Sequence, residues 1–145
     1  MERRVDVVTL AVADLERALA FYRDGLGLES GGITGTQFEG DESTPAGAVA
    51  MFRFDSGLIF ALYPRSELAK DAEMPVGPAS SGDFSLAQLV STRADVDTLL
   101  ARAEAAGATV SRPHERPWGI YSGYFRDLDG HLWEIIHNPQ PAATE

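Results

Sequence analysis

A single carboxylate, Glu134, is the residue of this chain best placed to do chemistry. It lies between Tyr121 and Pro139, in YSGYFRDLDGHLWEIIHNP, where aromatic and β-branched runs flank an Asp-Leu-Asp-Gly turn sequence. This pattern predicts a β-hairpin in which Glu134 shares one face with Leu132 and Ile136. A carboxylate among apolar neighbours is costly to bury unless it is paired, protonated or coordinating something. Glu134 is therefore predicted to be a polar anchor for a ligand or a general base.

Other side chains that could bind metals or react give weaker signals. His114 lies in a loop bounded by prolines, His131 follows the turn directly, and His137 falls on the face opposite Glu134. Each is interpreted as a surface or hydrogen-bonded histidine rather than a metal ligand. The chain has no cysteine, so thiolate metal sites and cysteine nucleophiles are excluded.

Aromatic side chains cluster before and within the hairpin. The segment around Trp118 and Tyr121 is punctuated by glycine, so these two residues could overhang a pocket. The same composition is equally typical of a hydrophobic core. The sequence leaves both interpretations open.

Composition restricts the class of protein and its partners. A chain of 145 residues with 44% hydrophobic residues suits one globular structural domain. The formal charge of −10 argues against nucleic acid as a partner. If this charge does more than keep the protein in solution, it favours a cationic ligand. No apolar run approaches the roughly 20 residues of a membrane span, and the first residues lack a secretory signal pattern. A cytoplasmic protein without membrane contact is predicted.

The elements that must position Glu134 form two similar halves. In the first, strand patterns at 5–12, 48–54 and 58–63 accompany a helical stripe that begins at Asp14 and ends near Gly25. In the second, strand patterns at 84–90, around 110, at 121–126 and at 131–137 accompany a helix from Asp95 to Gly107. Each half is predicted to be a β-α-β-β-β module. The predicted boundaries are 1–64 for the first module, 65–82 for a linker, 83–139 for the second module and 140–145 for a tail.

Two motifs carry a resemblance to a known family. AVADLERALAFYRDGLGLE in the first half and YFRDLDGHLWEIIHNP in the second resemble the vicinal oxygen chelate superfamily, which includes glyoxalases, bleomycin-resistance proteins and extradiol dioxygenases. The resemblance implies an α+β fold in which tandem βαβββ modules form a curled, cup-shaped mixed sheet. It also implies pairing of modules, for which we expect a homodimer.

The resemblance further implies positions for metal ligands. In metal-dependent members each module offers two ligands to the cup, usually His or Glu, and these positions fall at Val7, about Ala61, about Ser85 and Glu134. Only Glu134 offers a strong donor, and Gln88 near Ser85 is a weak one. Because one carboxylate does not hold a transition metal, neither a metal nor another cofactor is predicted.

These observations favour a protein that binds a small apolar or aromatic, or cationic, molecule in its cup without a metal. Glu134 would be its polar anchor, and the predicted pocket is lined by Val7, Thr9, Ala61, Tyr63, Ser85, Gln88, Trp118, Tyr121 and Glu134. One alternative is an enzyme that uses Glu134, either a lyase or dioxygenase with a recruited metal or a metal-free isomerase. Another is a cup filled by its own side chains, which would leave an interaction role.

Overall fold

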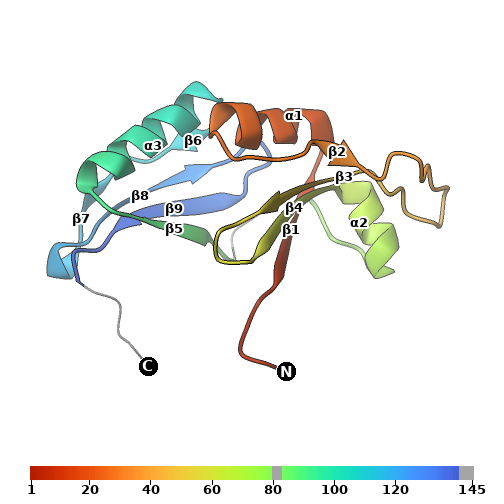
Figure 1. The fold of residues 1–145 in the computed structure, drawn as a ribbon, viewed down its shortest axis with the longest axis horizontal. Helices are drawn as coiled ribbons and strands as arrows, with labels where there is room; N and C mark the ends of the chain where they lie inside the picture. Colours follow the sequence, from red (N-terminus) through yellow and green to blue (C-terminus); the bar gives the residue numbers. More distant parts are fainter. Residues whose placement is uncertain (80–82, 141–145) are drawn as a thin grey trace. The chain divides into compact units, whose positions relative to one another are not determined.

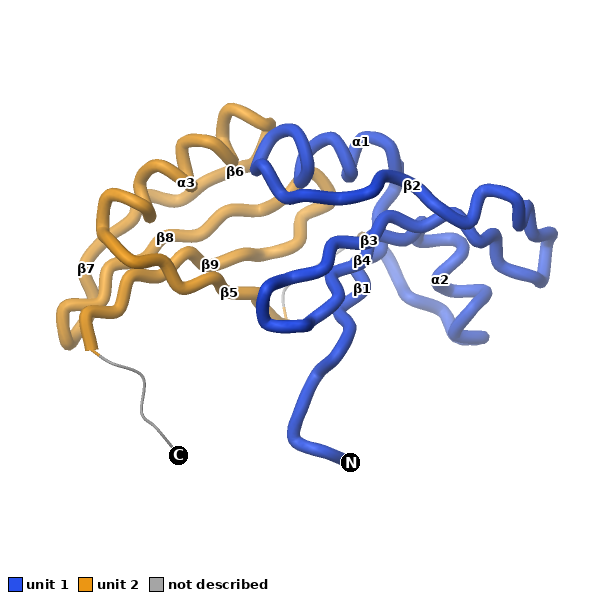
Figure 2. Tube along the Cα trace, viewed as in Figure 1, with its two compact units in different colours: residues 1–78 blue, residues 79–145 orange. Residues whose placement is uncertain are grey.

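The computed structural model describes residues 1–79 and 83–140. The chain divides into two compact units, Met1–Pro78 and Ala79–Glu145, which Figure 2 shows in blue and orange. The division falls within the predicted linker 65–82. Part of that linker (80–82) and most of the predicted tail (141–145) lie outside the described residues.

Unit 1 is a four-stranded mixed sheet with helices (Figure 1). Its elements are β1 (Val7–Val12), α1 (Leu15–Leu19), the π-helix η1 (Ala20–Gly25), β2 (Ile33–Thr34), β3 (Val49–Arg53), β4 (Ile59–Pro64) and α2 (Arg65–Ala72). The strands lie in the order β1-β4-β3-β2, with β1 parallel to β4 and the other pairs antiparallel. This is the β-α-β-β-β order predicted for the first half.

The helix boundaries of unit 1 follow local chemistry, with three corrections to the prediction. Asp14 caps α1 as expected, because its Oδ1 accepts the backbone N–H of Arg17 at 3.1 Å. The left-handed residue after the helix is Gly27 (φ 79°) and not Gly25. The predicted linker contains a full helix, α2, and the segment between the predicted helix and the predicted strand at 48–54 adds the short strand β2, which pairs with β3.

The core of unit 1 lies between its sheet and the α1–η1 helix. Tyr22 from η1 is buried and meets Phe60 edge to face, with ring centroids 5.0 Å apart. Phe52 and Leu62 are buried on the same sheet face. Each such side chain contributes about 1.5–3 kcal/mol through removal of apolar surface from water. This burial fixes which face of the sheet is covered and which remains available.

Unit 2 repeats the plan with one helix across a mixed sheet. Its elements are β5 (Leu86–Val90), α3 (Arg93–Ala105), β6 (Thr109–Val110), β7 (His114–Glu115), the 3-10 turn η2 (Pro117–Gly119), β8 (Tyr121–Arg126) and β9 (Leu132–His137). The strand order is β5-β9-β8-β6, β7 also pairs with β8, and β5 is parallel to β9. Figure 1 shows α3 lying across β8 and β9.

The helix of unit 2 begins earlier than predicted. Thr92, not Asp95, is the N-cap: its hydroxyl accepts the N–H of Asp95, while the Asp95 carboxylate accepts the N–H of Thr92, each at 3.1 Å. Asp95 therefore serves as the third residue of a capping box. Gly107 ends the helix region with φ 108°, a value that glycine adopts without strain.

The hairpin predicted around Glu134 is confirmed. Asp127 Oδ1 accepts the N–H groups of Asp129 and His131, both at 2.9 Å, and Gly130 adopts φ 86°. β8 and β9 then run antiparallel, so that Tyr124 lies directly opposite Glu134. The paired aspartates are thus turn residues.

The fold class is confirmed as α+β, with tandem βαβββ modules and two mixed, unclosed sheets. Within the described residues, no helix is long and apolar enough to cross a membrane.

Candidate functional site

Glu134 lies on the sheet face of unit 2 that is turned away from α3. Its neighbours on β9, Trp133 and Ile135, are buried, whereas Glu134 and Ile136 keep partial exposure. The strand alternation read from the sequence is therefore present in the structure. Across the sheet, Glu134 is flanked by Ala87 on β5 and Tyr124 on β8.

Tyr124 is electrostatically coupled to Glu134. Burial raises the pKa of the Tyr124 hydroxyl, and the negative charge of Glu134 and a hydrogen bond with its carboxylate raise this pKa further. The hydroxyl therefore keeps its proton and can donate it in a hydrogen bond to Glu134. A carboxylate held by a phenol is a defined acceptor for a ligand's donor group.

A guanidinium group completes the polar set on this face. Arg116 Nε donates to Ser122 Oγ at 2.7 Å, and the Arg116 guanidinium carbon lies 5.9 Å from the centre of the Tyr124 ring. Ser122 is fully buried. We call Arg116, Ser122, Tyr124 and Glu134 the Glu134 face.

Sequence reasoning missed three of these four residues. Alternation along the predicted strand 121–126, together with the hairpin pairing, could have placed Ser122 and Tyr124 on the same sheet face as Glu134. Arg116 carried no such signal, because β7 is only two residues long and lies in a segment interpreted as a loop.

Two predicted pocket residues lie on the other side of the sheet. Gln88 pairs with Ile135, so its side chain projects to the α3 face. Tyr121 also points to α3, where its hydroxyl donates to Asp97 Oδ1 at 2.6 Å and its ring packs under Arg93. The reason is that successive side chains of a strand point to alternate faces. Gln88 and Tyr121 each lie an odd number of residues from the residue of their strand that is paired with Glu134, so they project to the opposite face. Neither residue can line a pocket with Glu134 on that face.

The remaining predicted residues of unit 2 lie at the ends of strands. Ser85 directly precedes β5 and, by alternation, falls on the same face as Ala87. Trp118 lies in η2 with φ 64°, a left-handed conformation that is rare for a bulky residue, and is 79% exposed. A pocket role for both stays a prediction.

In unit 1, the four predicted pocket residues share one sheet face, which we call the Val7 face. Thr9 pairs with Ala61, and Val7 and Tyr63 lie two residues away on the same strands. The core residues Leu62 and Phe60 project from the opposite face. The Tyr63 hydroxyl donates to the backbone carbonyl of Ala46 and is therefore committed to the loop before β3. A ligand-binding role for the Val7 face stays a prediction.

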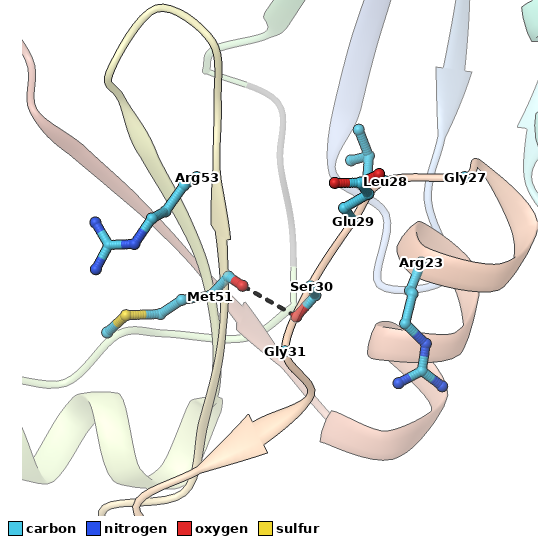
Figure 3. Close-up of a pocket in the computed structure, with 8 residues that line it drawn as sticks. All are labelled: Arg23, Gly27, Leu28, Glu29, Ser30, Gly31, Met51 and Arg53. Carbon is cyan, nitrogen blue, oxygen red and sulfur yellow. Dashed lines mark hydrogen bonds between the residues drawn. The ribbon is translucent and has the colours of Figure 1, made fainter.

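A cavity of about 730 Å³ opens in unit 1 at the edge of the same sheet (Figure 3). It is lined by Arg23, Gly27, Leu28, Glu29, Ser30, Gly31, Met51 and Arg53, none of which sequence reasoning selected. Ser30 Oγ donates to the backbone carbonyl of Met51 at 3.0 Å and so attaches the segment before β2 to β3. Arg23 is already paired with Asp24 at 2.9 Å.

The donor set at the implied ligand positions does not fit a transition metal. Val7 and Ala61 carry no donor atom, and Ser85, the other implied position of unit 2, carries a hydroxyl in place of an imidazole or a carboxylate. In residues 1–79 and 83–140, no group of three or more His, Cys, Asp or Glu side chains could hold an ion. A stable site for zinc or a similar ion needs several nitrogen, oxygen or sulfur donors, and Glu134 supplies one carboxylate.

The sequence profile of the Glyoxalase/Bleomycin resistance protein/Dioxygenase superfamily matches residues 4–135. The chain belongs to this superfamily, as the two motifs indicated. Among curated proteins, none matches the chain.

Solved structures give the same family and fold. A glyoxalase-related enzyme from Fulvimarina pelagi is 30% identical, with a TM-score of 0.78 over 99% of this chain and 94% of its own. Lactoylglutathione lyase from Agrobacterium tumefaciens is 27% identical, with a TM-score of 0.66 over 94% and 95%. The fosfomycin resistance protein FosX from Listeria monocytogenes shares the fold at 21% identity, with a TM-score of 0.67 over 95% of both chains.

Proposed function

We propose that the protein binds a small, largely apolar or aromatic molecule on the Glu134 face without a metal ion. The observation that carries this proposal is that the implied metal-ligand positions lack strong donors other than Glu134, and that Glu134 is hydrogen-bonded to a tyrosine. Glu134 is coupled to Tyr124, and the position beside it on β5 is Ala87. Such a face offers a few polar groups within apolar surroundings, which is the usual composition of a small-molecule site.

Apolar side chains around the anchor support a hydrophobic ligand. Ile136 and Leu132 flank Glu134 on β9, and Leu89 on β5 is paired with Ile136 and 69% exposed. An aromatic ring covering these side chains would remove them from water and gain about 25 cal/mol per Å² of apolar surface.

The test is to measure binding of a neutral aromatic probe, phenylacetamide, by calorimetry and by changes in backbone amide NMR shifts. We expect shifts at Tyr124 and Leu89, and at least about tenfold weaker binding in Glu134→Gln, because a charge-assisted hydrogen bond is lost. The matched control is Glu104→Gln on the exposed side of α3, which should bind as the wild type does. Equal binding by wild type and Glu134→Gln would contradict the proposal.

Metal content gives a separate check of the same proposal. We expect no stoichiometric transition metal in protein prepared without a histidine tag, because isolated carboxylates bind such ions weakly. About one metal per chain, lost in Glu134→Ala, would contradict the metal-free proposal and favour a lyase or dioxygenase.

A second candidate is a metal-free isomerase with Glu134 as the general base. Glu134 would remove a carbon-bound proton, and the Tyr124 hydroxyl would donate its proton at another substrate atom. The proton on Glu134 would then pass to Tyr124 along their hydrogen bond, which restores both groups. The enzyme relatives named above add support for catalysis. Exchange of a carbon-bound proton of a bound ligand with D₂O, abolished in Glu134→Gln, would favour this candidate.

We also propose that the protein is a homodimer. β1 and β5 are the terminal strands of their sheets, and each carries an exposed apolar side chain, Val7 and Leu89. Light scattering should give about twice the 15.6 kDa chain mass, and a monomer at micromolar concentration would contradict the proposal. The cytoplasmic location stays a prediction.

A further inference from the structure

The position of Arg116 relative to the sheet follows from the pairing of β7 with β8. His114 lies opposite Ser122 and Glu115 lies opposite Tyr121. Glu115 projects to the α3 face with Tyr121, where it accepts from Arg93 Nη1 at 2.7 Å. Arg116 is the next residue in an extended conformation, so its side chain projects to the opposite face. This is the face of Glu134.

The structure holds the guanidinium of Arg116 in one orientation. Its Nε donates to the fully buried Ser122 hydroxyl at 2.7 Å, and the group lies over the Tyr124 ring. The backbone N–H of Arg116 also donates to the carbonyl of Ile120 at 2.7 Å, which closes the loop that carries η2. A guanidinium fixed in this way loses little side-chain entropy when it binds a ligand.

The two terminal nitrogens of Arg116 remain uncommitted. Within the described residues, they make no hydrogen bond or ion pair, and Arg116 forms no ion pair with Glu134. Tyr124 interacts with both of the opposite charges. The face therefore presents a cationic donor pair and an anionic acceptor that share an aromatic neighbour.

We infer that the ligand of the Glu134 face carries an oxyanion, a carboxylate or a phosphate-type group, that is bound by the terminal nitrogens of Arg116. Its hydrophobic part would cover Tyr124, and a hydroxyl or amino group would donate to Glu134. This inference rests on the proposed function and specifies its ligand class. The overall charge of −10 opposes an anion at long range, but salt screens that charge beyond about 8 Å, whereas Arg116 acts in contact.

The planar fork of a guanidinium suits this role. Two parallel N–H donors match the two oxygens of a carboxylate or phosphonate, and such charge-assisted pairs are among the strongest hydrogen bonds in proteins. A lysine at the same position would supply charge without the fork and without the Nε–H that Ser122 accepts.

Matched aromatic probes test the inference by calorimetry: phenylacetate, phenylphosphonate, the neutral phenylacetamide and the cation phenethylammonium. We expect at least one of the two anions to bind the wild type at least about tenfold more tightly than phenylacetamide. The identity of that anion distinguishes a carboxylate ligand from a phosphate-type one. Raising the salt concentration should weaken binding of the anion and leave phenylacetamide unchanged.

Variants of Arg116 assign the preference to this side chain. Arg116→Gln should abolish the preference for the anion and retain phenylacetamide binding, and Arg116→Lys should retain part of the preference. Ser122→Ala keeps the charge but removes the hydrogen bond that orients it, so an intermediate loss is expected. The control is Arg112→Gln, which removes an equal charge from a residue in the segment between β6 and β7 and should bind as the wild type does. Retained binding of phenylacetamide shows in each case that the variant is folded.

The outcomes separate this inference from the proposed function. If phenylacetamide binds and depends on Glu134 while no anion is preferred, or if the preference survives in Arg116→Gln, only the inference is overturned. Tightest binding of phenethylammonium would overturn it as well. If no probe binds the wild type, the inference and the proposed function fail together.

Discussion

The Val7 face of unit 1 and the Glu134 face of unit 2 come from equivalent positions of two similar modules, yet they carry different chemistry. The Val7 face presents Val7, Thr9 and Ala61, and its one polar aromatic residue, Tyr63, is bonded to a backbone carbonyl. The Glu134 face presents a carboxylate, a phenol and a guanidinium that are coupled to one another. A repeated fold therefore fixes where a site can lie, while the side chains of one module decide what it can do.

The contrast extends to how each unit uses a partly exposed carboxylate. In unit 1, Glu67 accepts from the N–H of Ala46 at 2.9 Å and from Lys70 Nζ at 3.1 Å, and it accepts the hydroxyl of Ser66 as well. Its capacity is used to attach α2 to the loop before β3. Glu134 keeps acceptor capacity for a ligand, because Tyr124 is its one partner among the described residues. Glu67 therefore has a structural role in unit 1, whereas the acceptor capacity of Glu134 is the basis of the binding function proposed for unit 2.

The largest expected effect is a loss of folding stability that differs between the core face of unit 2 and the Glu134 face. Ile135 is 1% exposed against α3, whereas its neighbour Ile136 is partly exposed on the Glu134 face. Ile135→Ala should lower the free energy of unfolding by about 2–5 kcal/mol, because it leaves a cavity. Ile136→Ala is the matched control and should cost clearly less in chemical denaturation. Equal losses would mean that both faces are packed and that no face is open for a ligand.

A smaller effect concerns the structural carboxylate of unit 1. The backbone N–H of Ala46, with help from Ser66 and Lys70, lowers the pKa of Glu67 from 4.5 to about 2. A carboxyl group whose pKa is lowered by folding stabilises the protein at pH values above the pKa that the group has in the unfolded chain. This contribution should be complete above pH 4.5 and lost as the pH falls toward 2.

Thermal unfolding of wild type and Glu67→Gln over this pH range measures that contribution. The difference between them should be largest near neutral pH and shrink on acidification. Glu42→Gln, an exposed carboxylate of the loop before β3, serves as the control. A difference that does not change with pH would show that packing, and not the charge of Glu67, attaches α2 to the loop.

The smallest expected effect tests the coupling within the Glu134 face. Glu134→Gln should lower the pKa of Tyr124 toward its ordinary value, because the negative charge and the hydrogen bond to it are lost while burial remains. NMR titration of ¹³C-labelled tyrosine, assigned with Tyr124→Phe, would measure the change. Tyr121 is the internal control, since Asp97 on the opposite face raises its pKa. An unchanged Tyr124 would mean that Glu134 points away from it.

The sequence by itself determined the hairpin, the module order and the family. The Asp127 to Gly130 turn could be predicted because its hydrogen bonds are local: a side chain binds backbone groups two and four residues away. The same is true of the Asp14 cap. The placement of Glu134 followed from alternation in one strand, which also needs no distant contact.

Only the tertiary structure decided which residues join Glu134. Gln88 and Tyr121, two of the predicted pocket residues, project to the α3 face. The register of β5 and of β8 with β9 decides which residues of each strand share a face with Glu134. Arg116 joins the Glu134 face through β7, a strand of two residues that is too short to give a periodic pattern. Alternation along one strand is a local property, but the composition of a face is created by cross-strand register, and that is why the site needed the fold.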